Sequence, residues 1–261
     1  MNMTIPQIKA MLDKADEQEF QALERAVSAD TRKGVKSALA KARKRLDGER
    51  KERERLESLY VFEESFAEGS ESLIVGLDEV GRGSVAGPLA VGAVVLPRSE
   101  HIRGLNDSKQ INPEKRLEIA QVVKEQALAW TVAYISPNEI DRDGMTMSLR
   151  RAFTQALADI DSALPNVSVV LIDGNPIHID PRERNVVKGD ARCASIAAAY
   201  IVAKTERDRL MVELSSQYPA YEFDVNKGYA SPQHIEAIRT HGLSPIHRSS
   251  FCRSFMQETL F

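Results

Sequence analysis

The sequence has few of the features that mark secreted or membrane proteins. Only two cysteines, Cys193 and Cys252, occur in 261 residues, too few for a disulfide framework, so a reducing cytoplasm is the simplest location. The longest apolar runs, 89–96 and 196–203, are much too short to cross a bilayer. Acidic residues stand where a secretion signal would be apolar. We therefore expect a cytoplasmic protein without membrane segments.

Several common catalytic motifs are also missing. The chain has no G-x-x-x-x-G-K-[ST], no G-x-S-x-G and no Cys/His pair with zinc-finger spacing, which disfavours P-loop, serine hydrolase and zinc-finger functions. The run 81–86, GRGSVA, matches the short dinucleotide-binding fingerprint. However, two acids precede it and a predicted strand, not a helix, follows it, so no helix N-terminus would bind the pyrophosphate. A dinucleotide-dependent oxidoreductase is thus the weaker reading.

Charge is unevenly distributed along the chain. The net charge is −3, but residues 31–55 hold eleven Lys or Arg and four acids. This run is either a solvated helical face or a contact for a polyanion. The first ~70 residues are glycine-poor with helical periodicity, and Thr4 with Gln7 predicts a capping box. The polar stretch 63–72 reads as a linker. It separates a helical region, 1–68, from a second domain, 72–261.

The second domain has the pattern of an α/β fold. Short apolar runs rich in branched residues predict strands, and longer periodic segments predict helices. The strands are expected at 73–80, 89–96, 131–135, 167–173 and a short segment near 186, and the helices at 113–129, 147–164, 191–218 and 232–241. The first two strands are expected to pair. Asp190 stands where it would cap the helix 191–218.

Four carboxylates lie where apolar elements end. Asp78 and Glu79 follow a strand, Asp173 ends another, and Asp190 precedes the most apolar helix. If they converge, they repel one another until a cation binds, and all-oxygen ligands suit Mg²⁺ or Mn²⁺. Adjacent strand residues point to opposite faces, so Asp78 and Glu79 share a site only if the strand bends there. Taken singly, each could be a cap, a turn residue or a surface ion pair.

A series of ordered motifs resembles type 2 ribonuclease H (ribonuclease HII). The resemblance runs from about 72 to 253 and is carried by the segments VGLDEVGRGSVAGP (75–88), GLNDSK (104–109), LIDGN (171–175), VVKGDAR (186–192), SIAAAYIVAKTERD (195–208), NKGY (226–229) and HGLSPIHRSSF (241–251). It implies a ribonuclease H-like mixed sheet flanked by helices. The helical N-terminal region lies outside these motifs. Type 3 enzymes usually carry GKG where this chain has GRG, which favours type 2.

The resemblance also implies residue roles. Asp78, Glu79, Asp173 and Asp190 resemble the catalytic and metal-binding carboxylates. Substrate contacts are implied for two groups: Gly81, Arg82, Gly83 and Tyr229 at the ribose 2′-OH, and Asn106, Ser108 and Lys109 at the phosphate backbone. Lys188 and Arg192 are basic residues next to the carboxylates and are expected to contact phosphates. Ser84, Ala191 and Tyr200 depart from the residues usual in the family.

These observations predict a metal-dependent endonuclease, monomeric and using Mn²⁺ or Mg²⁺. We expect it to hydrolyse the phosphodiester 5′ of a ribonucleotide in duplex DNA or in RNA/DNA hybrids, leaving 3′-OH and 5′-phosphate ends. Such an enzyme removes misincorporated ribonucleotides and RNA primers. Two alternatives stay open at this point: a type 3 enzyme that cuts only long hybrids, and a non-catalytic hybrid-binding protein.

Overall fold

The computed structural model describes residues 3–69, 71–98, 101–105 and 111–256. The chain divides into two compact units, Met1–Glu57 and Ser58–Phe261, and the long helix α3 (Lys33–Glu64) contributes residues to both. Within the described ranges, no helix is long and apolar enough to span a membrane. The predicted domain limits of 1–68 and 72–261 remain predictions.

The N-terminal unit consists of α1 (Ile5–Lys14), α2 (Glu17–Ala26) and the first part of α3. The predicted capping box is confirmed: the Thr4 side chain accepts from the Gln7 amide, and the Gln7 side chain accepts from the Thr4 amide. Arg45 of α3 donates to the carbonyls of Leu12 and Ala15, which ties α1 to α3. Apolar side chains at helical spacing fill the space between the three helices: Ile8, Leu12, Phe20, Val27, Val35, Ala38, Ala42 and Leu46.

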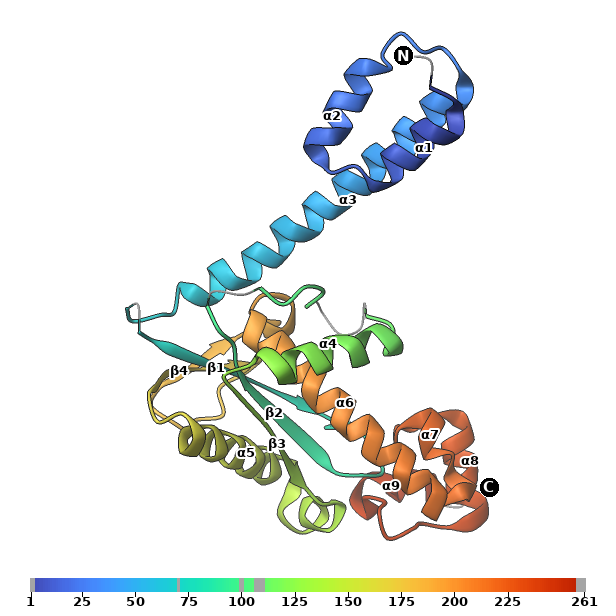
Figure 1. Cartoon of the computed structure of the whole chain (residues 1–261). Coiled ribbons are helices and arrows are strands. Elements are labelled where there is room, and N and C mark those ends of the chain that lie inside the picture. Colours follow the sequence, from blue (N-terminus) through green and yellow to red (C-terminus); the bar gives the residue numbers. More distant parts are fainter. Residues whose placement is uncertain (1–2, 70, 99–100, 106–110, 257–261) are drawn as a thin grey trace. The chain divides into compact units, whose positions relative to one another are not determined.

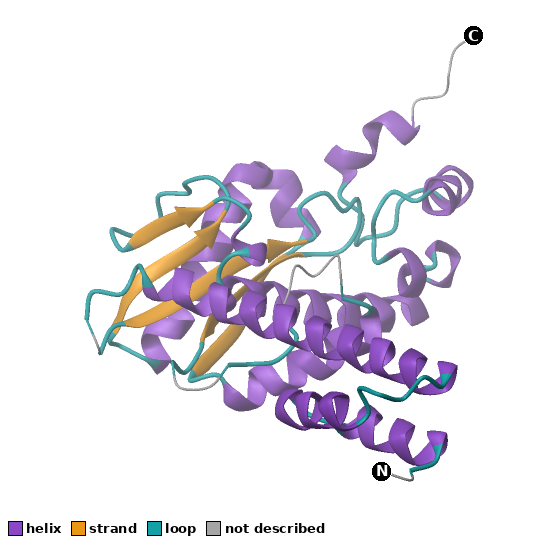
Figure 2. Ribbon diagram, turned by 90° about the horizontal axis from the view of Figure 1, so that it is seen from above, coloured by secondary structure: helices purple, strands orange, loops and turns teal. Residues whose placement is uncertain are grey.

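The second unit is built on a mixed five-stranded sheet (Figures 1 and 2). The strands are β1 (Leu73–Val80), β2 (Leu89–Val95), β3 (Ala129–Ile135), β4 (Val167–Asp173) and β5 (Glu183–Val186), in the order β3-β2-β1-β4-β5. β2 runs antiparallel to β1 and β3, whereas β4 runs parallel to β1 and β5. The ribonuclease H-like mixed sheet and the pairing of the first two strands are as predicted.

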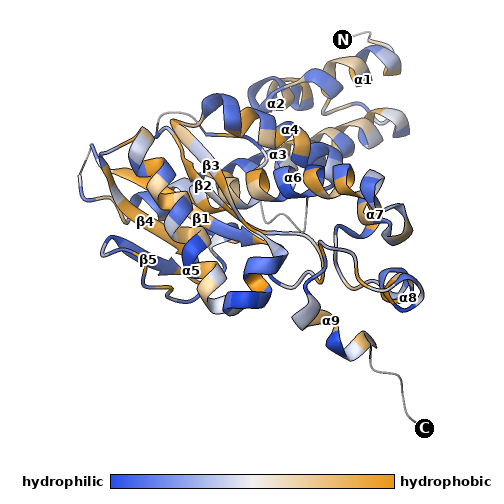
Figure 3. Cartoon of the chain, turned by 90° about the horizontal axis from the view of Figure 1, so that it is seen from below, coloured by the Kyte–Doolittle hydropathy of each residue, from blue (hydrophilic) through white to orange (hydrophobic). Residues whose placement is uncertain are grey.

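Helices cover both faces of this sheet (Figure 1). α5 (Pro137–Ala163) packs on one face, and α6 (Ala194–Gln217), beside α4 (Pro113–Gln126), packs on the other. Because strand residues alternate, β1 sends Val75 and Leu77 into the core under α5. On the other face a Cβ at Gly76 would overlap the Ile196 backbone, so α6 lies directly on the strand. In Figure 3 most of β2 and β4 is coloured as hydrophobic, as expected for a sheet covered on both sides.

Two helices begin at places other than those predicted. α5 begins at Pro137 instead of 147, because Ser136 forms a capping box with Glu139 and the helix continues through a kink at Gly144. α6 begins at Ala194 instead of 191. The remaining helices are α7 (Phe223–Asn226), α8 (Pro232–His241) and α9 (Ser249–Met256). Of these three, only α8 was predicted from the sequence.

Candidate active site

The four carboxylates singled out in the sequence lie around the ends of β1, β4 and β5. β1 and β4 are parallel neighbours, with Leu77 opposite Ile172, so Asp78 and Asp173 follow at the same edge of the sheet. Asp190 lies in the 3₁₀ turn Gly189–Ala191 that follows β5. The negative charges of Asp173, Glu79 and Asp190 all act on Asp78. The fold therefore gathers these four acids at one end of the sheet.

The two adjacent acids of β1 lie on opposite faces of the strand. The pairing of β1 with β2 continues without a break through Asp78, Glu79 and Val80. The irregularity in the pairing of β1 falls at its other end, against β4. The bend that would turn both acids to one face is therefore not seen in the pairing with β2. Asp78 therefore points to the α6 face, and Glu79 lines a pocket that Leu149 of α5 also lines.

Asp78 is a buried carboxylate with no basic partner. Its side chain belongs to a residue only 4% exposed, and it accepts a hydrogen bond from the Glu79 amide at 2.7 Å. Burial, followed by the charges of Asp173 and Glu79, raises the pKa of Asp78 well above its ordinary value. In the part of the chain that the structure describes, Asp78 forms no ion pair. The pKa of Glu79 is also raised by burial, which Arg82 opposes at 3.3 Å.

This donor set suits a hard divalent cation. A buried anion without a counter-ion is costly, and a bound metal ion removes that cost. Carboxylate oxygens are the preferred ligands of Mg²⁺ and Mn²⁺. As they stand, however, no three His, Cys, Asp or Glu side chains among the described residues are arranged to hold one ion together. Metal binding would require the carboxylates to turn toward one another.

Asp173 fixes the turn that carries Asp190. The Asp173 Oδ1 accepts a hydrogen bond from the Gly189 amide at 2.6 Å. A Cβ at residue 189 would meet the end of the Ile196 side chain, so a larger residue there would push Ile196 aside. Lys188 enters the turn in the left-handed conformation, with a φ of 57°. Asp190 is therefore held in a tight turn. The N-cap residue of α6 is Cys193 and not Asp190, which corrects the sequence prediction.

Glu63, a residue that the sequence analysis missed, caps α6 instead. The N-cap residue Cys193 makes no capping hydrogen bond with its side chain. Glu63, in the last turn of α3, accepts from the Ser195 amide at 2.7 Å. Burial raises the pKa of Glu63 to about 7. Beside it, the guanidinium of Arg192 lies 4.1 Å from the Phe62 ring centre. No local sequence pattern connects residues 63 and 195.

The glycine-rich loop after β1 rests on two buried arginines, also missed. Arg207 of α6 donates to the carbonyls of Ala86, Pro88 and Lys227 at 2.8–3.1 Å. Arg248 donates to the carbonyls of Arg82 and Gly87 at 2.9–3.1 Å. No local pattern pointed to them, because the residues next to each arginine are mostly half-buried or exposed. A buried charged side chain needs such partners.

Loop glycines leave room for these arginines. Gly81 has a φ of 82°, and a Cβ there would overlap the Arg207 guanidinium. Gly83 is exposed, with nothing within 4 Å of the position a Cβ would take. A sugar can therefore approach the backbone at Gly83 closely. Ser84, one of the departures noted above, is fully buried, and its hydroxyl has no hydrogen-bond partner in the described structure.

Tyr229 is brought next to this loop. The carbonyl of Gly228 accepts hydrogen bonds from the amides of Val85 and Ala86 at 2.9 and 3.1 Å, which joins the two segments. Tyr229 is 39% exposed, and the charged groups of Lys204 and Arg207 lie 5.6 and 5.7 Å from its ring centre. A partly exposed aromatic ring therefore lies beside the glycine loop, where it can contact a nucleotide.

Family comparison agrees with this arrangement. The family model described as Ribonuclease HII matches residues 75–254, and that described as Ribonuclease HII N-terminal domain matches residues 4–67. The chain belongs to the ribonuclease HII family. It is 38% identical over 260 residues to a Ribonuclease HII of Clostridium acetobutylicum, which covers 97% of this chain and 100% of that protein. As a ribonuclease HII, the chain is an endoribonuclease H, a hydrolase acting on RNA/DNA hybrids.

Solved ribonucleases H have the same fold. The ribonuclease H2 of Pyrococcus horikoshii has a TM-score of 0.60 and 27% identity, covering 70% of this chain and 96% of that one. The RNase HII in the PCNA:RNase HII complex of Archaeoglobus fulgidus has a TM-score of 0.61 and 23% identity, covering 72% and 98%. Bst-RNase HIII in complex with Mn²⁺ has a TM-score of 0.56 and 22% identity. The match covers 70% of this chain and 65% of that one.

The remaining residues expected to contact substrate are distributed as follows. Arg82, Lys188 and Arg192 are exposed at the ends of the elements that carry the carboxylates. Asn106, Ser108 and Lys109 lie outside the described residues. In the ribonuclease HII fold seen here, the carboxylates, the glycine loop and Tyr229 therefore belong to one unit of the chain.

Proposed function

We propose that this enzyme cuts duplex DNA on the 5′ side of an embedded ribonucleotide, as well as the RNA strand of hybrids. The products would carry 3′-OH and 5′-phosphate ends. The observation that carries the proposal is the uncompensated burial of Asp78 beside Asp173 and Asp190, together with a glycine loop next to an open tyrosine. The buried carboxylates suit metal-dependent hydrolysis of a phosphodiester. The glycine loop and the tyrosine suit recognition of a sugar.

We assign metal binding to Asp78, Glu79, Asp173 and Asp190. Asp78 and Glu79 leave β1 on opposite faces, but Asp173 lies near both, since its charge acts on each of them. Mg²⁺ or Mn²⁺ held there would activate the attacking water and neutralise charge on the leaving oxygen. Water, and not the 2′-OH, would then be the nucleophile, which gives the product ends stated above. Asp173 would keep its hydrogen bond to the Gly189 amide and so hold Asp190 in position.

We assign recognition of the 2′-OH to the glycine loop and Tyr229. The backbone at Gly83 is open to a sugar, and polar main-chain groups can bind a hydroxyl that only RNA has. Tyr229 would stack or hydrogen-bond at the junction nucleotide, where stacking contributes about 1–3 kcal/mol. Arg82, Lys188 and Arg192 would contact phosphates, as would Asn106, Ser108 and Lys109, without reading the sequence.

The test uses an end-labelled DNA duplex with one central ribonucleotide, in Mg²⁺ or Mn²⁺. Wild type is compared with Asp173→Asn, and an all-DNA duplex is the control. A single nick 5′ of the ribonucleotide, absent from variant and control, supports the proposal. Cleavage of a long hybrid without that nick would instead indicate a type 3 specificity.

The N-terminal unit offers a further contact for the duplex. Many basic residues of α3 are paired, for example Arg45 with Glu49 and Arg50 with Asp47. Lys33, Lys44 and Lys51 are exposed and form no ion pair within the described ranges. At ~100° per residue they lie within about 20° of one another around the helix and span ~27 Å. We propose that this lysine stripe contacts phosphates along the duplex.

Changing the three lysines of the stripe to Gln tests this contact. Each lost phosphate contact lowers the slope of log affinity against log salt by about 0.9, so the slope should fall by roughly 2–3 while cleavage continues. The control triple removes the same charge elsewhere in the unit: Lys9, Lys14 and Lys41. Equal slopes for the two triples would rule the stripe out.

We also propose a cytoplasmic monomer that removes misincorporated ribonucleotides and RNA primers. Its two cysteines, Cys193 and Cys252, are buried free thiols, which suits a reducing compartment. Sedimentation at micromolar concentration tests the monomer, and a dimer would contradict it. Accumulation of ribonucleotides in DNA after loss of the enzyme tests the cellular role.

A further inference from the structure

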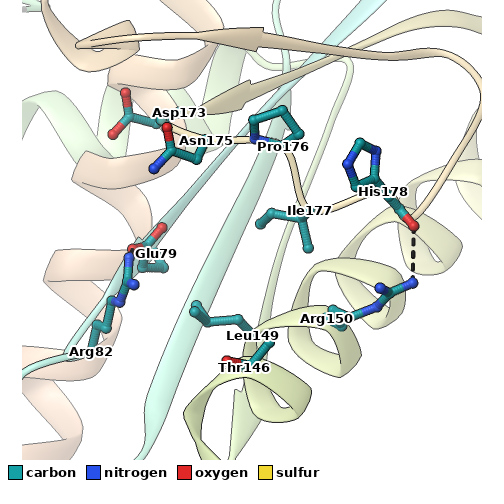
Figure 4. A pocket seen from close by; sticks show the side chains of 11 residues that line it. Glu79, Arg82, Thr146, Leu149, Arg150, Asp173, Asn175, Pro176, Ile177 and His178 are labelled. Carbon is teal, nitrogen blue, oxygen red and sulfur yellow. Dashed lines mark hydrogen bonds and ion pairs between the residues drawn. The ribbon is translucent and has the colours of Figure 1, made fainter.

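A pocket opens beside the carboxylates, on the α5 face of the sheet (Figure 4). Its volume is about 400 Å³, within the range of sites that hold one small molecule or one nucleotide. β1 contributes Glu79, the glycine loop contributes Arg82, and β4 contributes Asp173. The opposite wall comes from α5 and from the loop after β4: Thr146, Leu149, Arg150, Gly174, Asn175, Pro176, Ile177 and His178.

Arg150 is the distinctive residue of this pocket. Among the residues that the structure describes, Arg150 makes one side-chain hydrogen bond, from Nη2 to the carbonyl of His178 at 3.1 Å (Figure 4), and no ion pair. Its neighbour Arg151 binds both Glu139 and Asp143, at 2.7 and 2.8 Å. Arg150 thus keeps most of its donors available, across the pocket from Glu79 and Arg82.

The loop that forms the wall is held in one shape. The carboxylate of Glu183 accepts hydrogen bonds from the amides of Ile177, His178 and Ile179 at 2.8–3.2 Å. His178 has a φ of 57°, a left-handed conformation that costs free energy in a residue other than glycine. The carbonyl that positions Arg150 therefore belongs to a strained, fixed turn, as in a preformed binding site.

The chemistry of the lining fits a nucleotide. Leu149, Pro176 and Ile177 form an apolar surface suited to a sugar or a base. Thr146 and Asn175 add hydrogen-bonding groups beside it. A guanidinium at the far end matches a phosphate, which it can bind through two parallel hydrogen bonds.

We propose that this pocket is a subsite for a nucleotide next to the cleaved bond, and that Arg150 binds the far phosphate of that nucleotide. The inference rests on the proposed function, because it places the cleaved phosphodiester at the carboxylates that border the pocket. Arg150 contacts the substrate but takes no part in the bond change. It acts on binding of one strand position.

The test combines a variant with a substrate series. The variants are Arg150→Gln and, as the matched control, Arg151→Gln. The substrates are ribonucleotide-containing duplexes in which one phosphate at a time is a neutral methylphosphonate. We expect Arg150→Gln to raise KM about five- to tenfold with kcat within twofold. Its salt slope should fall by about 0.9, whereas Arg151→Gln should behave as wild type.

The substrate series decides where Arg150 acts. In wild type, one methylphosphonate near the ribonucleotide should raise KM by the same factor as Arg150→Gln. In the variant, that same substitution should cost nothing further, because the partner is already missing. The proposal would be overturned if, at every phosphate position, the methylphosphonate raised the KM of Arg150→Gln by the same factor as that of wild type. A wild-type KM for Arg150→Gln would also overturn it. If the wild-type enzyme itself makes no nick, the proposed function fails. That outcome can be told apart from the two outcomes that overturn only the role of Arg150.

Discussion

Glu63→Gln should remove a pH dependence of stability that the wild-type chain carries. Burial raises the pKa of Glu63 to about 7, from an ordinary value of 4.5. The folded protein therefore keeps a proton on Glu63 that the unfolded chain has already lost. The contribution of protonated Glu63 to the free energy of unfolding is complete below pH 4.5. It is lost as the pH rises through about 7. Gln keeps an oxygen for the Ser195 amide but has no charge to bury.

The size of the effect follows from the two pKa values. At 1.36 kcal/mol per pKa unit, the loss between pH 5 and pH 8 is about 2–3 kcal/mol. The free energy of unfolding of Glu63→Gln should therefore be close to that of wild type at pH 5 and higher by about this amount at pH 8. The other buried acids, Asp78 and Glu79, titrate in both proteins, so their contribution cancels in the difference.

Urea unfolding with EDTA present, followed by fluorescence, measures this difference. The chain has one tryptophan, Trp130 in β3, which reports on the unit that contains Glu63. Glu64→Gln is the matched control, because the Glu64 side chain is 53% exposed and pairs with Arg98 at 3.2 Å. A gap between Glu63→Gln and wild type that stays constant from pH 5 to pH 8 would refute the reasoning.

Three further predictions follow from the same structure. Asp78→Asn should abolish nicking and, in EDTA at pH 8, raise the free energy of unfolding by roughly 1–3 kcal/mol, because a buried charge is removed; urea titration tests it, and a loss of stability would contradict it. Gly92→Ala should destabilise by about 2–3 kcal/mol, because its Cβ would overlap a carbonyl of α6, whereas Gly48→Ala, which meets nothing within 4 Å, should not. Arg248→Met should lower the thermal midpoint and weaken cleavage at a single ribonucleotide, because three hydrogen bonds to loop carbonyls are lost; unchanged cleavage would show that the loop holds its shape without them.

Local sequence patterns predicted the elements that depend on local interactions. The strand Val167–Asp173 has the limits predicted from its apolar run, and the Thr4–Gln7 capping box forms as expected. The placement of acids at strand ends also followed from the sequence, because the apolar runs that predict β1 and β4 each end in or next to a carboxylate.

Features that depend on distant contacts could not be predicted in this way. α6 begins at Ala194 because Glu63, 131 residues before it in the chain, supplies the acceptor. A reader of the local sequence finds Asp190 at a suitable position and assigns the cap to it. The kink at Gly144 depends on a φ of 77°, which a single glycine permits but does not require.

The hydrogen bonds under the glycine loop bear on one departure from the family. Ser84 stands where the family usually has a proline, which raises the question of how a loop with three glycines keeps one conformation. Arg207 and Arg248 answer it, because between them they bind the carbonyls of four loop residues from the buried side. Burial lowers the pKa of Arg248 to about 9, which still leaves it charged at neutral pH. These hydrogen bonds hold the loop from its buried side without a proline, so we expect the loop to keep its shape and its recognition of the sugar.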